Sequence, residues 1–370
     1  MLRVQKYGGS SVADVARVRR VAERVATAVR AGDQVVVVVS AMGNTTNELL
    51  ALAREVTRTP GRRELDMLIS VGERVSMALL AMALHELGIP ARSFTGSQSG
   101  IITDEAHASA RVVEVRPDRV REALAAGEVA IVAGFQGVSR AREVTTLGRG
   151  GSDTTAVVLA AALHADECEI CSDVDGIWSA DPRAVPTAIK LDQLTLDEAL
   201  AMARNGAKVL YEDAVAWAHR EGITLRASAT ANDGGGTLVV PARGEDRVAA
   251  IVSDTQLGLG PLALLDSLPG PGVRAAGPWG VLVDLRNLHA PVEALVAVAS
   301  VAVVGARIGA DPRRLASVLA ATRHHLDGEP EGWWASADAV VMVVKTSVAA
   351  SLERHLHFSF VDRSGISGSP

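Results

Sequence analysis

The sequence predicts an α/β protein, a three-layer αβα sandwich around a mostly parallel sheet, followed by a smaller α+β domain. Val35–Val39 is an uninterrupted β-branched run, which is typical of a strand covered on both faces. Extended runs alternate with amphipathic helical stretches through residues 1–230, the pattern of a parallel sheet between helices. A length of 370 residues suits two domains, and a hydrophobic fraction of 48% allows each to bury a core.

The pattern opens with a strand, a glycine turn and a helix. Leu2–Tyr7 is extended, Gly8–Ser11 forms the turn, and apolar residues at spacings of three and four predict a helix from Val15 to Val29. A long helix is predicted from about Arg62 to Leu87. Further strands are predicted at Ala91–Phe94, Val129–Ala133, Cys168–Ser172 and Ile223–Arg226, and further helices at Pro117–Ala126, Ser152–Ala165, Leu196–Asn205 and Tyr211–Arg220.

Composition argues against several classes of function. The 37 basic and 43 acidic residues are intermixed, with a net charge of -6, so no patch that would hold nucleic acid is expected. The most apolar short stretch, Val35–Val39, is far below the roughly 18 to 20 residues that span a membrane. The strand-like residues 1–10 are unlike a signal segment, and two cysteines make no disulfide framework. We therefore expect a cytoplasmic protein.

Two glycine-bearing turns at strand ends are candidates for phosphate binding. Lys6 stands at a strand end beside Gly8, Gly9 and Ser10, where backbone amides and one ammonium could approach a polyphosphate. In Thr145–Thr155, three glycines lead into a helix, with Ser152 as the expected N-cap and Asp153 in the first turn. Taken alone, the first turn is more typical of a purely structural role, and the second is equally compatible with a structural or a binding role.

A third turn, after the strand that ends at Ser172, contains Asp173 and Asp175. These carboxylates could hold magnesium indirectly or bind a ribose, although Asp-rich turns are commonly only turns. The chain has neither a Gly-x-x-x-x-Gly-Lys-Ser/Thr motif nor a Gly-x-Gly-x-x-Gly after its first strand, which excludes the two commonest nucleotide-binding loops.

The cysteines and histidines do not suggest a metal site. Cys168 and Cys171 are three apart on a predicted strand, so they point to opposite faces and are expected to be buried thiols. His355 and His357 are expected on one face of an ordinary half-exposed strand.

Taken together, the polar segments resemble the aspartate kinase branch of the amino-acid kinase family. Seven segments carry the resemblance in family order: residues 4–12 (VQKYGGSSV), 40–50 (SAMGNTTNELL), 70–76 (SVGERVS), 95–103 (TGSQSGIIT), 133–155 (AGFQGVSRAREVTTLGRGGSDTT), 170–183 (ICSDVDGIWSADPR) and 206–211 (GAKVLY). The resemblance implies a catalytic domain over residues 1–240 that transfers the γ-phosphoryl group of ATP, with Mg²⁺, to the β-carboxylate of L-aspartate. Considered alone, each of three charged residues would be interpreted as an ordinary surface charge: Glu73, Arg183 and Lys208.

The resemblance also implies roles for individual residues. Lys6 and Asp153 are the expected catalytic residues. The expected phosphate- and ATP-binding residues are Lys6, Gly8, Gly9, Ser10, Ser172, Asp173, Trp178, Arg183 and Lys208, and the expected aspartate-binding residues are Ser40, Ala41, Thr46, Glu73, Arg149 and Asp153. Mg²⁺ is expected to be held mainly by the ATP phosphates and not by a set of protein ligands. Family members generally carry Thr and Tyr at the positions of Ser172 and Trp178, so an altered nucleotide affinity is expected.

Beyond a turn-rich break at residues 231–236, residues 247–370 partly resemble paired ACT modules, small βαββαβ units that bind effector amino acids in this family. The Pro-Gly-Pro-Gly stretch within Ser267–Trp279 is unlike the family's effector loop, so a role in homodimer formation is favoured over effector binding. Two alternatives stay open: a kinase for another amino-acid carboxylate, and a non-catalytic regulatory partner.

Overall fold

The computed structural model describes residues 1–231, 235–242, 244–268, 272–288 and 292–362. Its contacts divide the chain into two compact units. Unit 1 comprises Met1–Ile177 and Val209–Pro241, and unit 2 comprises Trp178–Lys208 and Ala242–Pro370. The segment Trp178–Lys208, which the sequence analysis placed in the first domain, thus packs with the C-terminal residues. Residues 232–234 of the predicted break and 269–271 of the Pro-Gly stretch lie outside the described residues.

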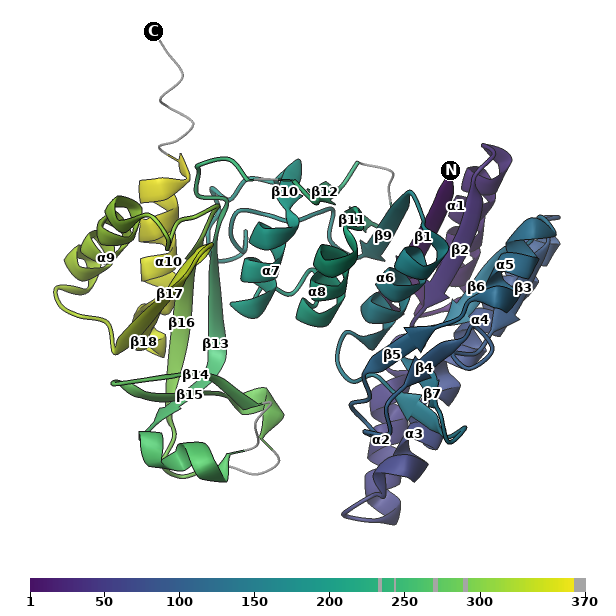
Figure 1. Ribbon diagram of the computed structural model, residues 1–370, viewed down its shortest axis with the longest axis horizontal. Helices are drawn as coiled ribbons and strands as arrows, with labels where there is room; N and C mark the ends of the chain where they lie inside the picture. Colours follow the sequence, from purple (N-terminus) through teal and green to yellow (C-terminus); the bar gives the residue numbers. More distant parts are fainter. Residues whose placement is uncertain (232–234, 243, 269–271, 289–291, 363–370) are drawn as a thin grey trace, which may run out of the picture. The chain divides into compact units, whose positions relative to one another are not determined.

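Unit 1 is built on a mostly parallel sheet (Figure 1). Within this unit the strand order is β12-β11-β9-β1-β2-β6-β3, and only β12 runs antiparallel to its neighbour. The strands are β1 (Leu2–Tyr7), β2 (Gln34–Val39), β3 (Ala91–Phe94), β6 (Val129–Ala133), β9 (Glu167–Ser172), β11 (Leu225–Ala229) and β12 (Thr237–Val240). All five valines of β2 are buried, as expected of a strand covered on both faces.

Helices cover both faces of this sheet. On one face, α1 (Val15–Arg30) and α4 (Val71–Glu86) share a core with Tyr7 and alternate valines of β2. On the other face, α6 (Gly151–Leu163) packs on β1, β2 and β9. The remaining helices of unit 1 are η1 (Gly9–Val12), α2 (Thr45–Val56), α3 (Arg62–Ile69), α5 (Asp118–Ala125) and α8 (Glu212–Glu221).

A small second sheet in unit 1 has the order β5-β4-β7-β8. Its strands are β4 (Ile101–Thr103), β5 (Val112–Val115), β7 (Gln136–Ser139) and β8 (Val144–Thr146). The last of these leads directly into the glycine turn before α6. This sheet therefore helps to place that turn.

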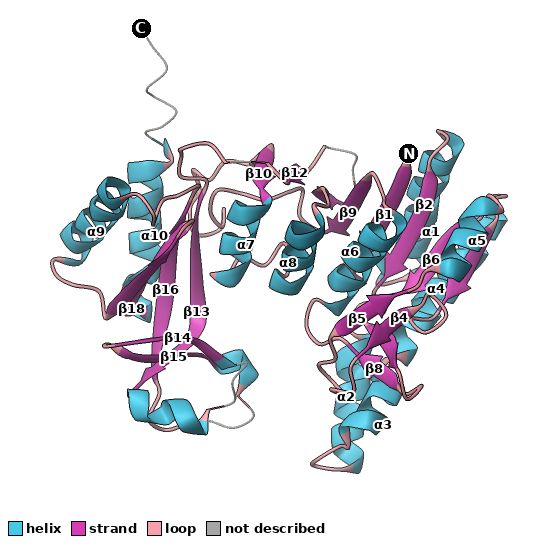
Figure 2. Ribbon diagram, in the orientation of Figure 1, coloured by secondary structure: helices cyan, strands magenta, loops and turns pink. Residues whose placement is uncertain are grey.

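Unit 2 contains a six-stranded antiparallel sheet with the order β14-β15-β13-β16-β18-β17 (Figure 2). Helices α9 (Pro312–Leu326) and α10 (Thr346–Phe360) pack on it through a shared apolar cluster. Its strands are β13 (Ala250–Gly260), β14 (Val273–Gly277), β15 (Gly280–Asp284), β16 (Val296–Val304), β17 (Gly332–Ser336) and β18 (Ala339–Lys345), and the unit also holds β10 (Gln193–Thr195), α7 (Leu196–Arg204), η2 (Leu262–Ser267) and η4 (Leu285–Asn287). Between β13 and β16 the described residues form only short 3-10 helices and strands, and no α-helix.

The predicted fold class is confirmed, and most predicted elements occur within a few residues of their expected limits. The long helix predicted from Arg62 to Leu87 is interrupted at Ser70, whose carbonyl accepts a hydrogen bond from the Gln136 side chain at 2.9 Å. Helix α6 begins at Gly151 and not after Ser152, because Gly150 adopts a left-handed conformation (φ 70°) as its cap. Ser152 therefore lies inside the first turn.

The strand predicted to carry His355 and His357 is wrong. Both residues lie in α10, whose buried Ala349, Leu352 and Leu356 recur at the spacing of a helix. Residues two apart on a helix do not share a face. His357 is fully buried, and His355 stacks on His325 with ring centroids 4.8 Å apart.

One stretch, Arg62–Glu86, is long and apolar enough by length and composition alone to cross a membrane. In the structure it forms two helices, α3 and α4, and Leu80 and Leu84 of α4 are fully buried in the cluster shared with α1 and β2. Both cysteines are buried and free, and only Cys171 belongs to the cluster under α1 and α4, as expected if the two thiols face opposite sides of β9.

Candidate active site

The loop after β1 is held close to the ends of two neighbouring strands. The Gly8 amide donates to the carbonyl of Cys171 at 3.3 Å, and the Gly43 amide donates to the carbonyl of Gly9 at 3.1 Å. A Cβ atom on Gly9 would lie 2.9 Å from the carbonyl oxygen of Ala41, so the close approach of these two loops requires glycine there. Ser10 is exposed at the end of the turn.

Lys6 forms an ion pair with Asp153 across this edge of the sheet. The Lys6 Nζ lies 2.7 Å from the Asp153 Oδ1, and Asp153 is buried in the first turn of α6. The carboxylate thereby holds the ammonium beside Gly8, where the position of a Cβ atom would be 3.4 Å from Nζ. An ammonium, the amides of a glycine loop and a helix N-terminus together favour bound anions.

Glu73, in the first turn of α4, brings an acid to the same edge. Its Oε1 accepts a hydrogen bond from the Ala41 amide at 3.2 Å, while Oε2 is buried without a hydrogen-bond partner among the described residues. Burial raises the pKa of Glu73 to about 7, although hydrogen bonds from the backbone amides of Glu73 and Ala41 act in the opposite direction. A buried, incompletely satisfied carboxylate is suited to pair with the ammonium group of a ligand.

The other predicted aspartate-binding residues lie on loops at this edge. Ser40 follows β2, and its amide donates to the Tyr7 carbonyl at 3.0 Å, while Thr46 is half-buried in the first turn of α2. Arg149 is exposed on the glycine turn before α6. At the next position, a Cβ atom on Gly150 would lie 2.3 Å from the Tyr211 ring, so this turn also requires glycine.

The predicted nucleotide-binding residues are divided between the two units. Ser172 ends β9 and Asp173 follows it, exposed, in unit 1. Trp178, Arg183 and Lys208 belong to unit 2. Arg183 is paired with Asp181 through two contacts of 3.0 and 2.7 Å, and hydrogen bonds from Arg183 hold the pKa of Asp181 below its usual range. No cluster of three metal-binding side chains occurs among the described residues.

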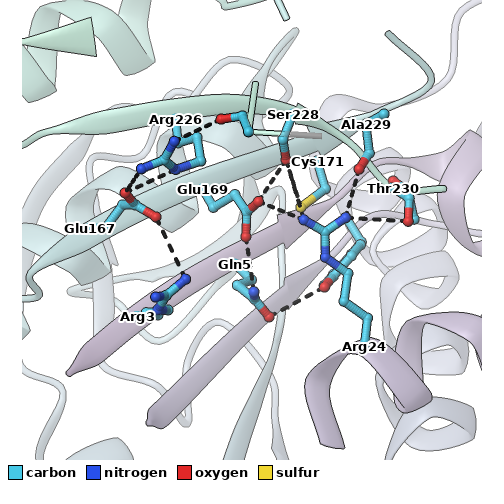
Figure 3. Close-up of polar contacts among 12 residues, drawn as sticks. Arg3, Gln5, Arg24, Glu167, Glu169, Cys171, Arg226, Ser228, Ala229 and Thr230 are labelled. Atoms are coloured by element: carbon cyan, nitrogen blue, oxygen red, sulfur yellow. Dashed lines mark hydrogen bonds and ion pairs between the residues drawn. The ribbon is translucent and has the colours of Figure 1, made fainter. Parts of the chain in front are cut away.

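A buried polar network, which the sequence analysis missed, supports these loops from the α1 face (Figure 3). Its centre is Glu169 of β9, which accepts hydrogen bonds from Arg24 at 2.6 Å, Ser228 at 2.6 Å and Gln5 at 2.9 Å. Arg24 also donates to the carbonyl of Ala229 at 2.6 Å. The network thus ties α1 to the ends of β9 and β11. Charged residues in otherwise apolar strands were the available signal.

One further contact connects this network to the loop after β1, and a separate buried carboxylate supports the turn before α6. The hydroxyl groups of Ser11 and Thr230 are 2.6 Å apart, which joins the loop after β1 to the residue that follows β11. The separate carboxylate is the fully buried Asp66 of α3. It accepts hydrogen bonds from the hydroxyl of Thr146, just before the second glycine turn, at 2.5 Å and from the Ala108 amide at 3.0 Å, and its Oδ2 lies 2.7 Å from His107 Nδ1. The loops are therefore held in place by buried polar side chains.

The fold and the site together define a class. The strands of the large sheet are mostly parallel, and their carboxyl ends carry Lys6, two glycine turns and a helix N-terminus, which is the α/β architecture with groups suited to bound anions. A sequence model described as "Amino acid kinase family" matches residues 1–226. The chain belongs to the amino acid kinase family.

Relatives with known names are aspartokinases. The aspartokinase of Mycolicibacterium smegmatis is 57% identical over 239 residues, which are 64% of this chain and 57% of that protein. The aspartokinase of Mycobacterium tuberculosis strain H37Rv is 58% identical over 240 residues, covering 65% of this chain and 57% of that protein. The matched region thus spans 57% of the length of these relatives.

Solved structures confirm the fold over nearly the whole chain. E. coli aspartokinase III in complex with aspartate and ADP has a TM-score of 0.79 at 24% identity and covers 97% of this chain and 99% of that chain. Aspartate kinase from Synechocystis is 33% identical with a TM-score of 0.61, and covers 100% of this chain and 70% of that one.

Proposed function

We propose that the protein is an ATP-dependent aspartate kinase, which phosphorylates the β-carboxylate of L-aspartate. The observation that carries the proposal is the Lys6–Asp153 pair beside the Gly8–Gly9 loop, together with the buried Glu73 of α4, which accepts a hydrogen bond from the adjoining loop. The names of the relatives, and the aspartate and ADP bound to aspartokinase III, support aspartate and a nucleotide as substrates.

The chemistry requires charge neutralisation and alignment, and no general base. A carboxylate oxygen of aspartate attacks the γ-phosphorus, the bond to the β,γ-bridging oxygen breaks, and ADP leaves with that electron pair. No proton moves in this step. Lys6 and the amides of Gly8, Gly9 and Ser10 stabilise the charge on the transferring group, and Asp153 fixes the ammonium of Lys6.

The aspartate substrate has one ammonium and two carboxylates to be recognised. Glu73 and Asp153 bind the ammonium, and the planar guanidinium of Arg149 pairs with the carboxylate that does not react. The loops after β2 position the substrate through Ser40, Ala41 and Thr46.

The nucleotide is bound by Ser172, Asp173, Trp178, Arg183 and Lys208. The two cations pair with phosphates, and the indole of Trp178 offers an aromatic face for the base. Mg²⁺ would be held mainly through the phosphate oxygens of ATP, and the exposed Asp173 could hold this hard cation indirectly. When bound, Mg²⁺ neutralises charge on those oxygens.

The test is turnover by the purified chain. With Mg-ATP and L-aspartate, we expect ADP release and an acyl phosphate that hydroxylamine converts to a hydroxamate. A product from L-glutamate and none from aspartate would contradict the substrate assignment. Background ADP release with every acid, together with calorimetric binding of an amino acid, would indicate the non-catalytic regulatory role instead.

The assembly and location proposed for this enzyme are a cytoplasmic homodimer joined through residues 247–370. Val301, Val303 and the other apolar residues of β16 lie inside the six-stranded sheet, whose edge strands are β14 and β17. Edge strands can pair with a second copy. Sedimentation at micromolar concentration should give the mass of a dimer, and a monomer would contradict this proposal.

A further inference from the structure

The segment Trp178–Lys190 carries two of the proposed nucleotide-binding residues, Trp178 and Arg183, and it packs against the last helix of the chain. We propose that α10 positions this segment for the nucleotide, and that His357 and Glu353 are positioning residues for ATP binding. This inference rests on the proposed function, because it assumes that Trp178 and Arg183 meet ATP.

The first anchor is Ser179, the residue directly after Trp178. Its amide donates to the Ile189 carbonyl at 2.9 Å, its carbonyl accepts from the Ile251 amide at 2.7 Å, and its hydroxyl lies 2.8 Å from His357 Nε2. Both Ser179 and His357 are fully buried. Every polar group of Ser179 is thus engaged, which fixes the backbone next to Trp178.

The hydrogen-bond partners of Ser179 and His357 indicate which atoms of the two side chains carry the protons. The Ser179 hydroxyl accepts a hydrogen bond from the Ile189 amide at 2.9 Å, so its own proton is available to His357 Nε2. Burial lowers the pKa of His357, which favours the neutral ring as acceptor. The proton of the ring then sits on Nδ1, 3.3 Å from Asp362 Oδ1.

The second anchor is Glu353, one turn earlier on the same face of α10. Its carboxylate is buried, accepts a hydrogen bond from the Ser253 hydroxyl at 2.8 Å and is hydrogen-bonded to the backbone of Asp181. The carboxylate of Asp181 in turn holds the guanidinium of Arg183. A continuous set of contacts therefore runs from α10 to Arg183.

Two weaker contacts extend the same interface along the segment. Arg354 donates to the carbonyl of Ala184 at 3.4 Å, and Thr187 donates to Asp362 at 3.2 Å. The segment between Ser179 and Thr187 is thus attached to residues 353–362 at four places. Loss of α10 contacts would release the backbone that carries Trp178 and Arg183.

A matched pair of substitutions tests this inference: His357→Ala and His355→Ala, which truncate the same side chain on different faces of α10. For His357→Ala we expect the KM for ATP to rise about fivefold to tenfold, the size of one lost buried hydrogen bond. The KM for aspartate should change less than about twofold, because Glu73 and Arg149 lie on other elements. His357→Gln, whose amide oxygen can accept from Ser179, should recover part of the loss, and His355→Ala should leave both constants unchanged.

Hydrogen exchange gives a readout that does not need activity. The backbone amides of residues 179–190 should exchange faster in His357→Ala than in His355→Ala. The amides of residues 34–39, in β2, are the internal control and should exchange at the same rate in both variants. Equal exchange in the two variants, or equal KM values for ATP, would overturn the inference. If the wild-type chain shows no aspartate-dependent turnover, the proposed function fails, while the exchange comparison still decides whether α10 holds this segment.

Glu353→Gln is a second variant, to be used if His357→Ala does not fold. It keeps the shape of the side chain and should also raise the KM for ATP selectively.

Discussion

The loops around Lys6 and the segment around Arg183 are held in place in different ways. The first loops are tied to neighbouring strand ends, as in the contact of Gly8 with Cys171. The second segment depends on α10, through pairs such as Ser179 and His357 that are 178 residues apart in the sequence. The loops proposed to meet phosphate and aspartate are therefore held by strands of their own sheet, which adjoin in space although they are far apart in the sequence. The segment proposed to meet the nucleotide is held by a helix, α10, from the C-terminal part of the chain.

Lys6→Ala is expected to cause the largest effect, because it removes the cation of the first region. Loss of a preformed electrostatic partner of the transferring phosphoryl group typically costs about 3 kcal/mol or more, so kcat should fall at least about a hundredfold. The assay is aspartate-dependent ADP release by a protein whose circular dichroism matches that of the wild type. Lys345→Ala, which truncates an exposed lysine, is the control, and unchanged turnover in Lys6→Ala would refute the role of this residue.

Arg24→Met tests the framework beneath the same loops. It leaves the buried Glu169 carboxylate without its cation, and breaking such a pair costs about 3 to 5 kcal/mol of unfolding free energy. Urea denaturation measures the loss. Adding Glu169→Gln to Arg24→Met should recover part of it, since no unpaired charge then remains. A double variant as unstable as the single one would show that the two residues are not coupled.

Glu73→Gln is expected to stabilise the protein at alkaline pH while weakening aspartate binding. Because burial raises the pKa of Glu73 from 4.5 to about 7, the folded protein keeps a proton that the unfolded chain has released between these values. The stabilisation that protonated Glu73 gives to the folded state is present below pH 4.5 and is lost as the pH rises to about 7. The free energy of unfolding falls by about 3 kcal/mol over this range. The variant should therefore exceed the wild type in stability at pH 8 and match it at pH 4.

The same group should shape the pH dependence of the wild-type enzyme. If ionised Glu73 pairs with the substrate ammonium, kcat/KM for aspartate rises as the pH passes through about 7. In Glu73→Gln this rise should disappear and the KM for aspartate should increase. A variant with an unaltered pH profile would assign the rise to another group.

Trp178→Tyr should have the smallest effect, and it tests the second region. A tyrosine keeps an aromatic face of smaller area, so the KM for ATP should change by less than about fivefold, and kcat by less. The measurement is initial-rate kinetics at varied ATP concentration. A change confined to the KM for aspartate would contradict the placement of Trp178 at the nucleotide.

Features that depend on residues close together in the sequence were predictable from the sequence. The strands, the glycine turns and the position of Lys6 follow from composition and spacing, and Gly9 is needed because Ala41 approaches it closely. Glu169 and Asp66 were missed as supports, because their partners come from other elements and only packing reveals them. The error at His355 and His357 arose because alternate polar residues were taken for a strand, although Ala349, Leu352 and Leu356 carry helical spacing.

The attachment of α10 to the segment Trp178–Lys190 limits where the chain could be split into two fragments for separate expression. A cut near Pro241 would separate Ala242–Pro370 from the strands of unit 1, but it would leave Trp178–Lys208 on the N-terminal fragment without its packing partners. Such a fragment would retain the whole family match at residues 1–226 and still expose the buried faces of Ser179 and Val185. We therefore expect neither part to be stable when the chain is divided at the boundary that is visible in the sequence, and loss of residues 353–362 by proteolysis should raise the KM for ATP.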